Sequence, residues 1–203
     1  MDGMALDKIF SNFSNVRKIS GVNSYFLNKP STPIKNKLVD VTEQQHVVSI
    51  SHDSETGAFT IAPDENGSGL WIPYLGNGPG HDGAKGNGTY TGKVADKEWV
   101  ATGPFSGCLA GAFFAKGLPH FAHIITPAHN HPCATTGEQI SGIIQATGAT
   151  KYETWKVDGT GAGIAFFMKY DGYWKRRFVY IHPDGSVCQM NMDSKIITYP
   201  QTV

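Results

Sequence analysis

Residues 158–185 read DGTGAGIAFFMKYDGYWKRRFVYIHPDG. Three Asp-Gly pairs begin thirteen residues apart in this stretch, at Asp158, Asp171 and Asp184, and apolar runs separate them. An Asp-Gly pair between apolar runs is a strong hairpin signal, because both central residues of a type I′ turn need a positive φ. The stretch therefore predicts an antiparallel meander with strands over 164–170 and 178–182. The intervening sequences do not resemble one another, so the spacing does not indicate a repeat family.

The chain upstream of the meander also favours strands. Two segments, 4–14 and 136–146, instead have the apolar spacing of amphipathic helices. We expect an α+β fold: a single β-dominated domain over 1–203, with mostly antiparallel sheets in a β-sandwich-like core and two or more peripheral helices. Apolar runs bounded by turn residues predict the upstream strands, over 46–52, 58–62, 70–74, 98–102, 109–115 and 121–126, the last two forming a hairpin around Lys116-Gly117.

The composition excludes several classes of protein. Charged residues make up 17% of the 203 residues, and 17 basic side chains balance 17 acidic ones. A surface that tracks phosphates usually has a basic excess, so we expect no nucleic-acid partner. No apolar run is long enough to span a bilayer and no secretory signal begins the chain, so we expect no membrane partner. Three cysteines without framework spacing predict a free thiol and a reducing compartment.

Residues 76–92, GNGPGHDGAKGNGTYTG, form a long glycine-rich stretch. They contain neither a phosphate-binding P-loop motif nor a dinucleotide-binding glycine motif between a strand and a helix. Long loops in compact domains are often functional. Two interpretations stay open, a binding loop and a tolerated surface insertion.

Candidate catalytic residues lie on the expected hairpin. Cys108 precedes its first arm, and His123 lies in the returning arm, within one diagonal step of the residue that faces Cys108, near Thr126. His120 lies nearer the turn. A cysteine nucleophile needs a base that takes its proton, and an imidazole serves this purpose. Gly107 permits a tight turn that leaves backbone N–H groups for an oxyanion. The alternative is that Cys108 is a buried apolar side chain, as most free cysteines are.

A second group of residues could form a metal site. His129, His131 and Cys133 are potential zinc ligands, although no matching pair follows at zinc-finger spacing. Cys188 is expected in the core. The only basic run, residues 175–177, is expected on a solvated turn or strand end, from which it could contact an acidic partner.

Four features in order along the chain resemble the catalytic core of the cytotoxic necrotizing factor deamidases, above all the compact single-domain lethal-factor members of that family. The resemblance covers roughly residues 46–127. Phe105 stands where the family has leucine. The spacing from Cys108 to His120 fits some members of the family, and the spacing to His123 fits others. The sequence around His123 matches that of the family's catalytic histidine. The four features are Leu70-Trp71-Ile72-Pro73-Tyr74, Thr102, Phe105-Ser106-Gly107-Cys108 and His123-Ile124-Ile125-Thr126-Pro127.

The resemblance implies a cysteine-dependent deamidase of protein glutamine that works through a thioester. The Cys108 thiolate would attack the carboxamide. His123 would first hold the thiolate, then protonate the leaving ammonia and then activate water, and Thr102 would orient His123 through its hydroxyl or carbonyl. Ser106 and Gly107 would form the turn and oxyanion region, and His120 is the alternative base. Neither a metal nor an organic cofactor is implied. If an amine replaced water, the same site would transglutaminate.

The resemblance further implies a monomeric bacterial toxin, made in the bacterial cytoplasm without a classical signal peptide, that acts in the host cytosol. Its host protein substrate would be a Rho-family GTPase or the DEAD-box helicase of translation initiation. Two other functions stay open. One is a zinc-binding or non-catalytic protein-interaction β-domain, and the other is a housekeeping amidase or chemoreceptor-type deamidase.

Overall fold

The fold comes from a computed structural model of the chain. The glycine-rich stretch over 76–92 lies outside the described residues except for 89–91, and His129, His131 and Cys133 lie outside them altogether. The structure describes residues 1–21, 39–40, 47–73, 89–91, 94, 96–126, 135–159, 161–191 and 195–197.

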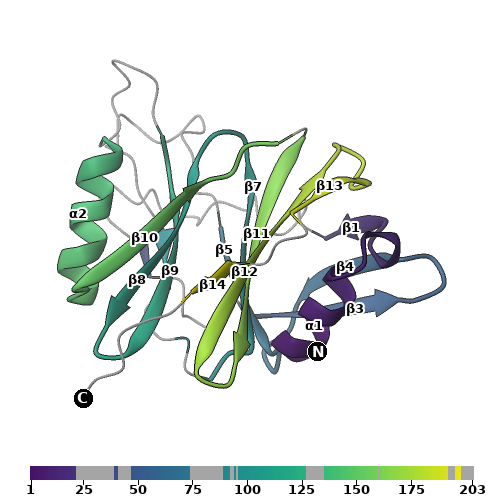
Figure 1. The fold of residues 1–203 in the computed structure, drawn as a ribbon, viewed down its shortest axis with the longest axis horizontal. Coiled ribbons are helices and arrows are strands. Elements are labelled where there is room, and N and C mark those ends of the chain that lie inside the picture. Colours follow the sequence, from purple (N-terminus) through teal and green to yellow (C-terminus); the bar gives the residue numbers. More distant parts are fainter. Residues whose placement is uncertain are drawn as a thin grey trace.

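A large, mostly antiparallel sheet forms one half of the molecule (Figure 1). Its strand order is β1-β4-β3-β5-β7-β11-β12-β13, and β14 also pairs with β12. Two neighbouring pairs, β1 with β4 and β5 with β7, are parallel. Its strands are β1 (Lys18–Ser20), β3 (Val47–Asp53), β4 (Ala58–Pro63), β5 (Gly69–Ile72), β7 (Trp99–Phe105), β11 (Ala162–Tyr170), β12 (Tyr173–Ile181), β13 (Val187–Met190) and β14 (Lys195–Ile197).

A smaller sheet packs against the large one and has the strand order β10-β8-β9-β6-β2. Phe121 of the small sheet stacks on Phe167 of the large sheet, with ring centroids 4.2 Å apart. These rings belong to a buried apolar cluster that fills the space between the sheets. The strands of the small sheet are β2 (Val39–Asp40), β6 (Thr89–Tyr90), β8 (Leu109–Ala115), β9 (Leu118–Ile124) and β10 (Lys151–Lys156).

One helix covers the outer face of each sheet (Figure 1). Helix α1 (Gly3–Phe10) packs on the large sheet, where the Phe10 ring lies 4.8 Å from that of Phe166. Helix α2 (Thr136–Thr147) packs on the small sheet, where Ile143 is buried with Phe113. It begins at a capping box formed by Thr135 and Glu138. The layers are therefore helix, small sheet, large sheet, helix. The short η1 (Phe13–Asn15) follows α1 in the chain.

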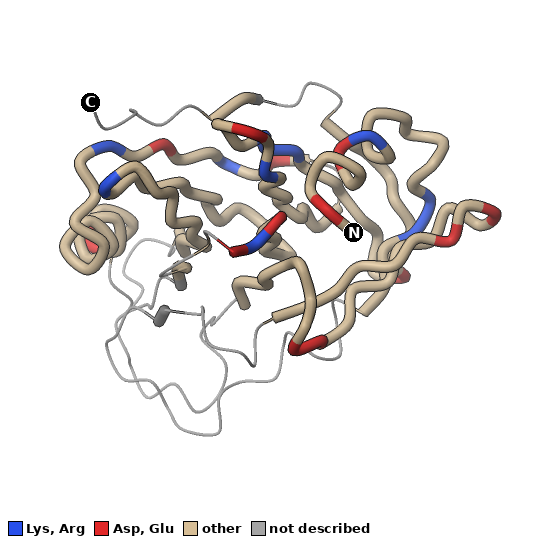
Figure 2. Tube along the Cα trace, turned by 90° about the horizontal axis from the view of Figure 1, so that it is seen from below, with Lys and Arg blue, Asp and Glu red and all other residues tan. Residues whose placement is uncertain are grey.

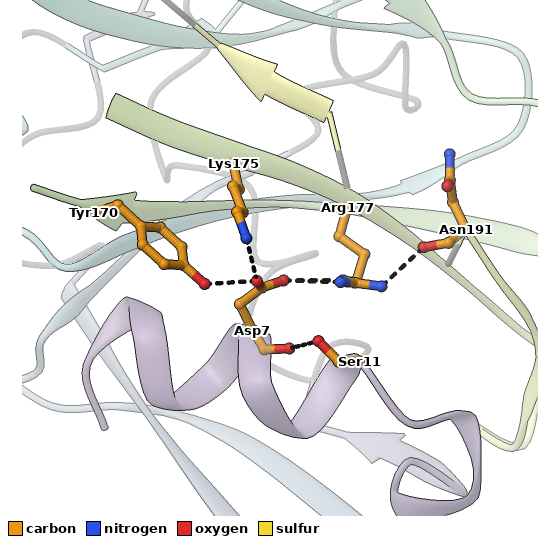
Figure 3. A network of polar contacts seen from close by, with 6 residues as sticks. All are labelled: Asp7, Ser11, Tyr170, Lys175, Arg177 and Asn191. Carbon is orange, nitrogen blue, oxygen red and sulfur yellow. Dashed lines mark hydrogen bonds and ion pairs between the residues drawn. The ribbon is translucent and has the colours of Figure 1, made fainter. Parts of the chain in front are cut away.

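A buried carboxylate fixes α1 to the large sheet (Figure 3). Asp7 accepts hydrogen bonds from Arg177 Nη2 at 2.9 Å, from the Tyr170 hydroxyl at 2.6 Å and from Lys175 Nζ at 3.2 Å. Burial by itself raises the pKa of Asp7, but hydrogen bonds from Tyr170 and Arg177 and the charge of Arg177 outweigh it and lower that pKa. The network joins two parts of the chain that are 170 residues apart.

The predicted fold class is confirmed, and the predicted meander forms from β11, β12 and β13. Asp158 lies before it, where the chain crosses from β10 of the small sheet to β11 of the large one. One turn differs from the prediction. The turn at Asp171-Gly172 is not type I′, because only Gly172 has a positive φ. The type I′ conformation occurs instead at Lys116 and Gly117, with φ of 50° and 75°, in the β8–β9 hairpin.

The basic run at 175–177 is also not solvated, which corrects the expectation from sequence. Arg176 and Arg177 are only 8% and 2% exposed. Elsewhere, basic and acidic residues are interspersed over the described chain (Figure 2). Among the described residues, no helix has the length and apolar character needed to cross a membrane.

Candidate active site

Three of the sequence features that resemble the deamidase motifs converge on one hydrogen-bonded chain between the sheets. Thr102 of β7 and His123 of β9 are both buried, and Thr102 Oγ1 lies 2.9 Å from His123 Nδ1. The same hydroxyl donates a hydrogen bond to the carbonyl oxygen of Ile72, the last residue of β5, at 2.9 Å. Thr102 of the large sheet therefore orients the His123 imidazole, which belongs to the small sheet, across the space between the two sheets.

The hydrogen-bond pattern fixes the tautomer of His123. The Ile72 carbonyl can only accept, so the single hydroxyl proton of Thr102 points to it. His123 Nδ1 must then be the donor in its contact with Thr102 Oγ1. In a neutral ring with Nδ1 protonated, Nε2 has the basic lone pair. Thr102 therefore sets up Nε2 as a general base.

A bulge in β7 brings Thr102 and Phe105 to the same face. Gly103-Pro104 on β7 oppose the single residue Ile164 on β11. The extra residue shifts the alternation of side chains, so two residues three positions apart both face inward. Strand β7 continues through Phe105, three residues beyond the expected strand over 98–102, and the turn begins at Ser106.

Phe105 completes the setting of the imidazole. Its ring stacks on His123 with centroids 4.2 Å apart and an interplanar angle of 16°. His123 is 1% exposed, and burial lowers its pKa to about 3. The ring is therefore neutral at physiological pH, the form in which Nε2 can accept a proton.

Cys108 lies on the inner face beside His123. It comes one residue before β8, and the register that pairs Leu109 with Ile124 places it opposite Ile125. Ala110 pairs directly with His123, so Cys108 and His123 are diagonal neighbours, with Cα atoms roughly 7–8 Å apart. Sites without substrate often have long catalytic contacts that tighten on binding.

The thiol is held in its neutral form. Burial raises the pKa of Cys108, and hydrogen bonds from the backbone and side chain of Thr126 oppose this only in part. With His123 neutral as well, the resting site contains a thiol and an imidazole rather than a thiolate–imidazolium pair. The proton must therefore leave Sγ as the nucleophile attacks.

The turn before Cys108 is built from Ser106 and Gly107. Gly107 has φ +107°, a conformation that other residues rarely adopt, although open space surrounds the position of an added Cβ. Its carbonyl oxygen accepts a hydrogen bond from Thr126 Oγ1 at 2.7 Å. Thr126 thus ties the nucleophile turn to the end of β9, a role that sequence analysis did not assign.

The alternative base, His120, lies on the other face of the small sheet. It pairs with Phe113, a member of the buried cluster beneath α2, whereas His123 pairs with the inward Ala110. Its Nδ1–H donates a hydrogen bond to the carbonyl oxygen of Thr91 at 2.8 Å. The register therefore separates His120 from Cys108.

Gln139 of α2 is a further positioning residue that sequence analysis missed. It is 2% exposed, and its amide donates from Nε2 to the Ile125 carbonyl at 2.9 Å and accepts from the Ile125 N–H at 3.0 Å. This pair of bonds fixes the backbone opposite Cys108. A buried polar residue on the inner side of an expected amphipathic helix was the available signal.

The alternative metal site is not tested by the structure, since His129, His131 and Cys133 lie outside the described residues. Within the part of the chain that is described, no three His, Cys, Asp or Glu side chains gather as metal ligands would. Cys188, expected in the core, is partly buried against the inter-sheet cluster, and its Sγ donates to the Tyr180 carbonyl oxygen at 3.4 Å.

No family model, curated protein or solved structure matches the chain. The resemblance to the necrotizing factor deamidases stays a prediction drawn from the ordered motifs.

Proposed function

We propose that the chain is a cysteine-dependent amidohydrolase that converts a glutamine of a host protein to glutamate. The observation that carries the proposal is the hydrogen bond between Thr102 and His123 across the two sheets. A residue that accepts from Nδ1 and is itself oriented by a carbonyl is the third member of a nucleophile–base–orienter arrangement. The diagonal placement of Cys108 beside His123 supplies the other two members.

The proposed reaction proceeds through a thioester. Sγ of Cys108 attacks the carboxamide carbon while Nε2 of His123 takes the thiol proton. That proton passes to the amide nitrogen as the C–N bond breaks, and ammonia leaves. His123 then removes a proton from water, which attacks the thioester; glutamate forms and the thiol regains its proton. The N–H of Cys108 and the Ser106–Gly107 turn would face the oxyanion.

The wider biological role extends this proposal and follows from the motif resemblance. The protein would be a bacterial toxin or effector that acts in the host cytosol as a monomer. The resemblance offers two substrate classes, Rho-family GTPases and the translation-initiation helicase. Transglutamination is the variant reaction if an amine reaches the thioester before water does.

The test compares host-cell lysates treated with wild-type protein or with Cys108→Ser by mass spectrometry. The proposal predicts glutamine-to-glutamate conversion at a single site in one protein, with wild type only. Equal conversion in both samples, or none, contradicts it. A stoichiometric metal in chelator-free protein that is lost on Cys133→Ser would support the zinc-binding domain instead.

A further inference from the structure

The basic run over 175–177 divides between the two faces of β12. Lys175 and Arg177 bind Asp7 on the outer face, under α1. Arg176 points the other way, into the space between the sheets, as expected from the alternation of side chains along a strand. The outer pair therefore has a structural role, and Arg176 needs a separate explanation.

Two aromatic rings hold the Arg176 guanidinium. Its Cζ lies 4.3 Å from the Phe178 ring centroid and 4.7 Å from that of Trp155 on β10. The residue is 8% exposed, and burial lowers its pKa to about 10, so it is still a cation at neutral pH. Cation–π contacts of this kind orient a guanidinium without using its N–H donors.

The hydrogen-bonding capacity of Arg176 is unused within the described chain. Its Nε is buried and has no hydrogen-bond partner. No ion pair joins it to a described carboxylate, although Glu153 lies close enough to raise its pKa. Nε is the only Arg176 nitrogen that is both buried and unpartnered, so the terminal nitrogens keep contact with solvent. A buried charged donor without an acceptor is unusual and points to a missing partner.

The guanidinium lies near the candidate active site. Trp155 pairs with Ala110, the residue that also pairs with His123. Cys108 is two positions before Ala110, so Trp155 and Cys108 are diagonal neighbours on the inner face of the small sheet, with Cα atoms roughly 7–8 Å apart. Trp155 is therefore a neighbour of both the nucleophile and Arg176.

We propose that Arg176, held between Trp155 and Phe178, binds an aspartate or glutamate side chain of the protein substrate and thereby helps to select the glutamine presented to Cys108. This inference rests on the proposed deamidase function. An acidic residue near the target glutamine would be the recognised feature.

The chemistry favours a single carboxylate over a phosphate. A planar guanidinium presents a fork of N–H donors that matches a carboxylate with two parallel hydrogen bonds. Phosphate sites usually combine several cations or backbone N–H groups, whereas the rings of Trp155 and Phe178 hold one guanidinium, with Lys195 as its cross-strand neighbour on β14. The chain as a whole has zero formal net charge, so no basic field attracts polyanions.

The test follows the Nε–Hε signal of Arg176 by NMR in Cys108→Ser protein, which cannot turn over substrate. The signal is assigned by its loss in Arg176→Lys. We expect a saturable shift on addition of capped hexaglutamate and none with capped hexaglutamine. Inorganic phosphate serves as the third probe. No shift with hexaglutamate, or tighter binding of phosphate, overturns the inference.

Matched variants complete the test. In isothermal titration calorimetry, which does not depend on the Arg176 signal, Arg176→Lys should weaken hexaglutamate binding at least about tenfold, because an ammonium cannot form the two-bond fork. Lys156→Gln removes one positive charge from an exposed position on β10 and should leave binding unchanged. An equal loss in both variants would indicate nonspecific attraction and overturn the inference. Binding without any deamidation by wild type would leave the carboxylate site standing and refute only the enzyme.

Discussion

Replacing Thr102 with valine tests the orientation of His123 directly. Valine keeps the shape of threonine but lacks the hydroxyl, so the Ile72 carbonyl and the His123 Nδ1–H both lose their partner. Thr102 is 0% exposed, and water cannot replace the lost bonds. Leaving a buried polar group unsatisfied costs about 1–3 kcal/mol. For two groups we expect the free energy of unfolding to fall by about 2–6 kcal/mol.

The same change removes the preference for the reactive tautomer. A hydrogen bond worth about 1–2 kcal/mol corresponds to a factor of about 5–30 in an equilibrium. We therefore expect Thr102→Val to move the Nδ1 proton toward Nε2 and to lower the deamidation rate by about that factor. Nitrogen-15 chemical shifts of the His123 ring report the tautomer without needing a substrate, and urea denaturation reports stability.

Two controls accompany this experiment. Thr102→Ser retains the hydroxyl and should retain the Nδ1–H tautomer. Thr60→Val removes a hydroxyl that makes an exposed contact with Ser20, and should change stability by less than about 0.5 kcal/mol. An unchanged tautomer and an unchanged rate in folded Thr102→Val would refute the orienting role of Thr102.

Three further predictions concern the supports of the site. Asp7→Asn should cost about 3 kcal/mol of unfolding free energy at pH 7, because it leaves Lys175 and Arg177 without their carboxylate. The pKa of Asp7 in the folded protein lies below 3.8, so the stabilisation by its carboxylate is present above pH 3.8 and is lost as the pH falls through the folded-state pKa. Urea denaturation should show this loss. A difference in unfolding free energy between wild type and variant that stays constant down to pH 2 would contradict it. Gln139→Leu should lower stability by about 2 kcal/mol and slow deamidation, because the Ile125 backbone loses both its bonds; equal melting and equal rates would show that α2 does not position the site. Burial raises the pKa of Cys108, so alkylation by iodoacetamide should be slow at pH 7 and should accelerate only above pH 9.0, whereas rapid alkylation at neutral pH would indicate a preformed thiolate.

The sequence predicted the local parts of the site well. The hairpin that joins Cys108 to His123 depends on neighbouring residues, and its arms were placed within a few positions. The register was one residue off, because the two-residue turn at Lys116-Gly117 places Ile125 rather than Thr126 opposite Cys108. The type of turn decides the register of a hairpin, and Lys-Gly is a weaker sequence signal for a type I′ turn than Asp-Gly.

The parts that sequence reasoning missed depend on contacts between distant segments. Residues 175–177 look like a solvated basic run until Asp7, 170 residues away from Arg177, is brought beneath β12. The pairing of Thr102 with His123 across the sheets was inferred from motif resemblance and not from spacing. The bulge at Gly103-Pro104 did have a local signal, since glycine and proline within a strand often mark a bulge.

The most direct test of the catalytic arrangement compares His123→Ala with His120→Ala in the deamidation assay. His123 faces Cys108 and bonds Thr102, whereas His120 lies on the opposite face of β9. We predict near-complete loss of deamidation in His123→Ala and a rate close to wild type in His120→Ala, with both variants folded. Near-normal turnover in His123→Ala with loss in His120→Ala would contradict it.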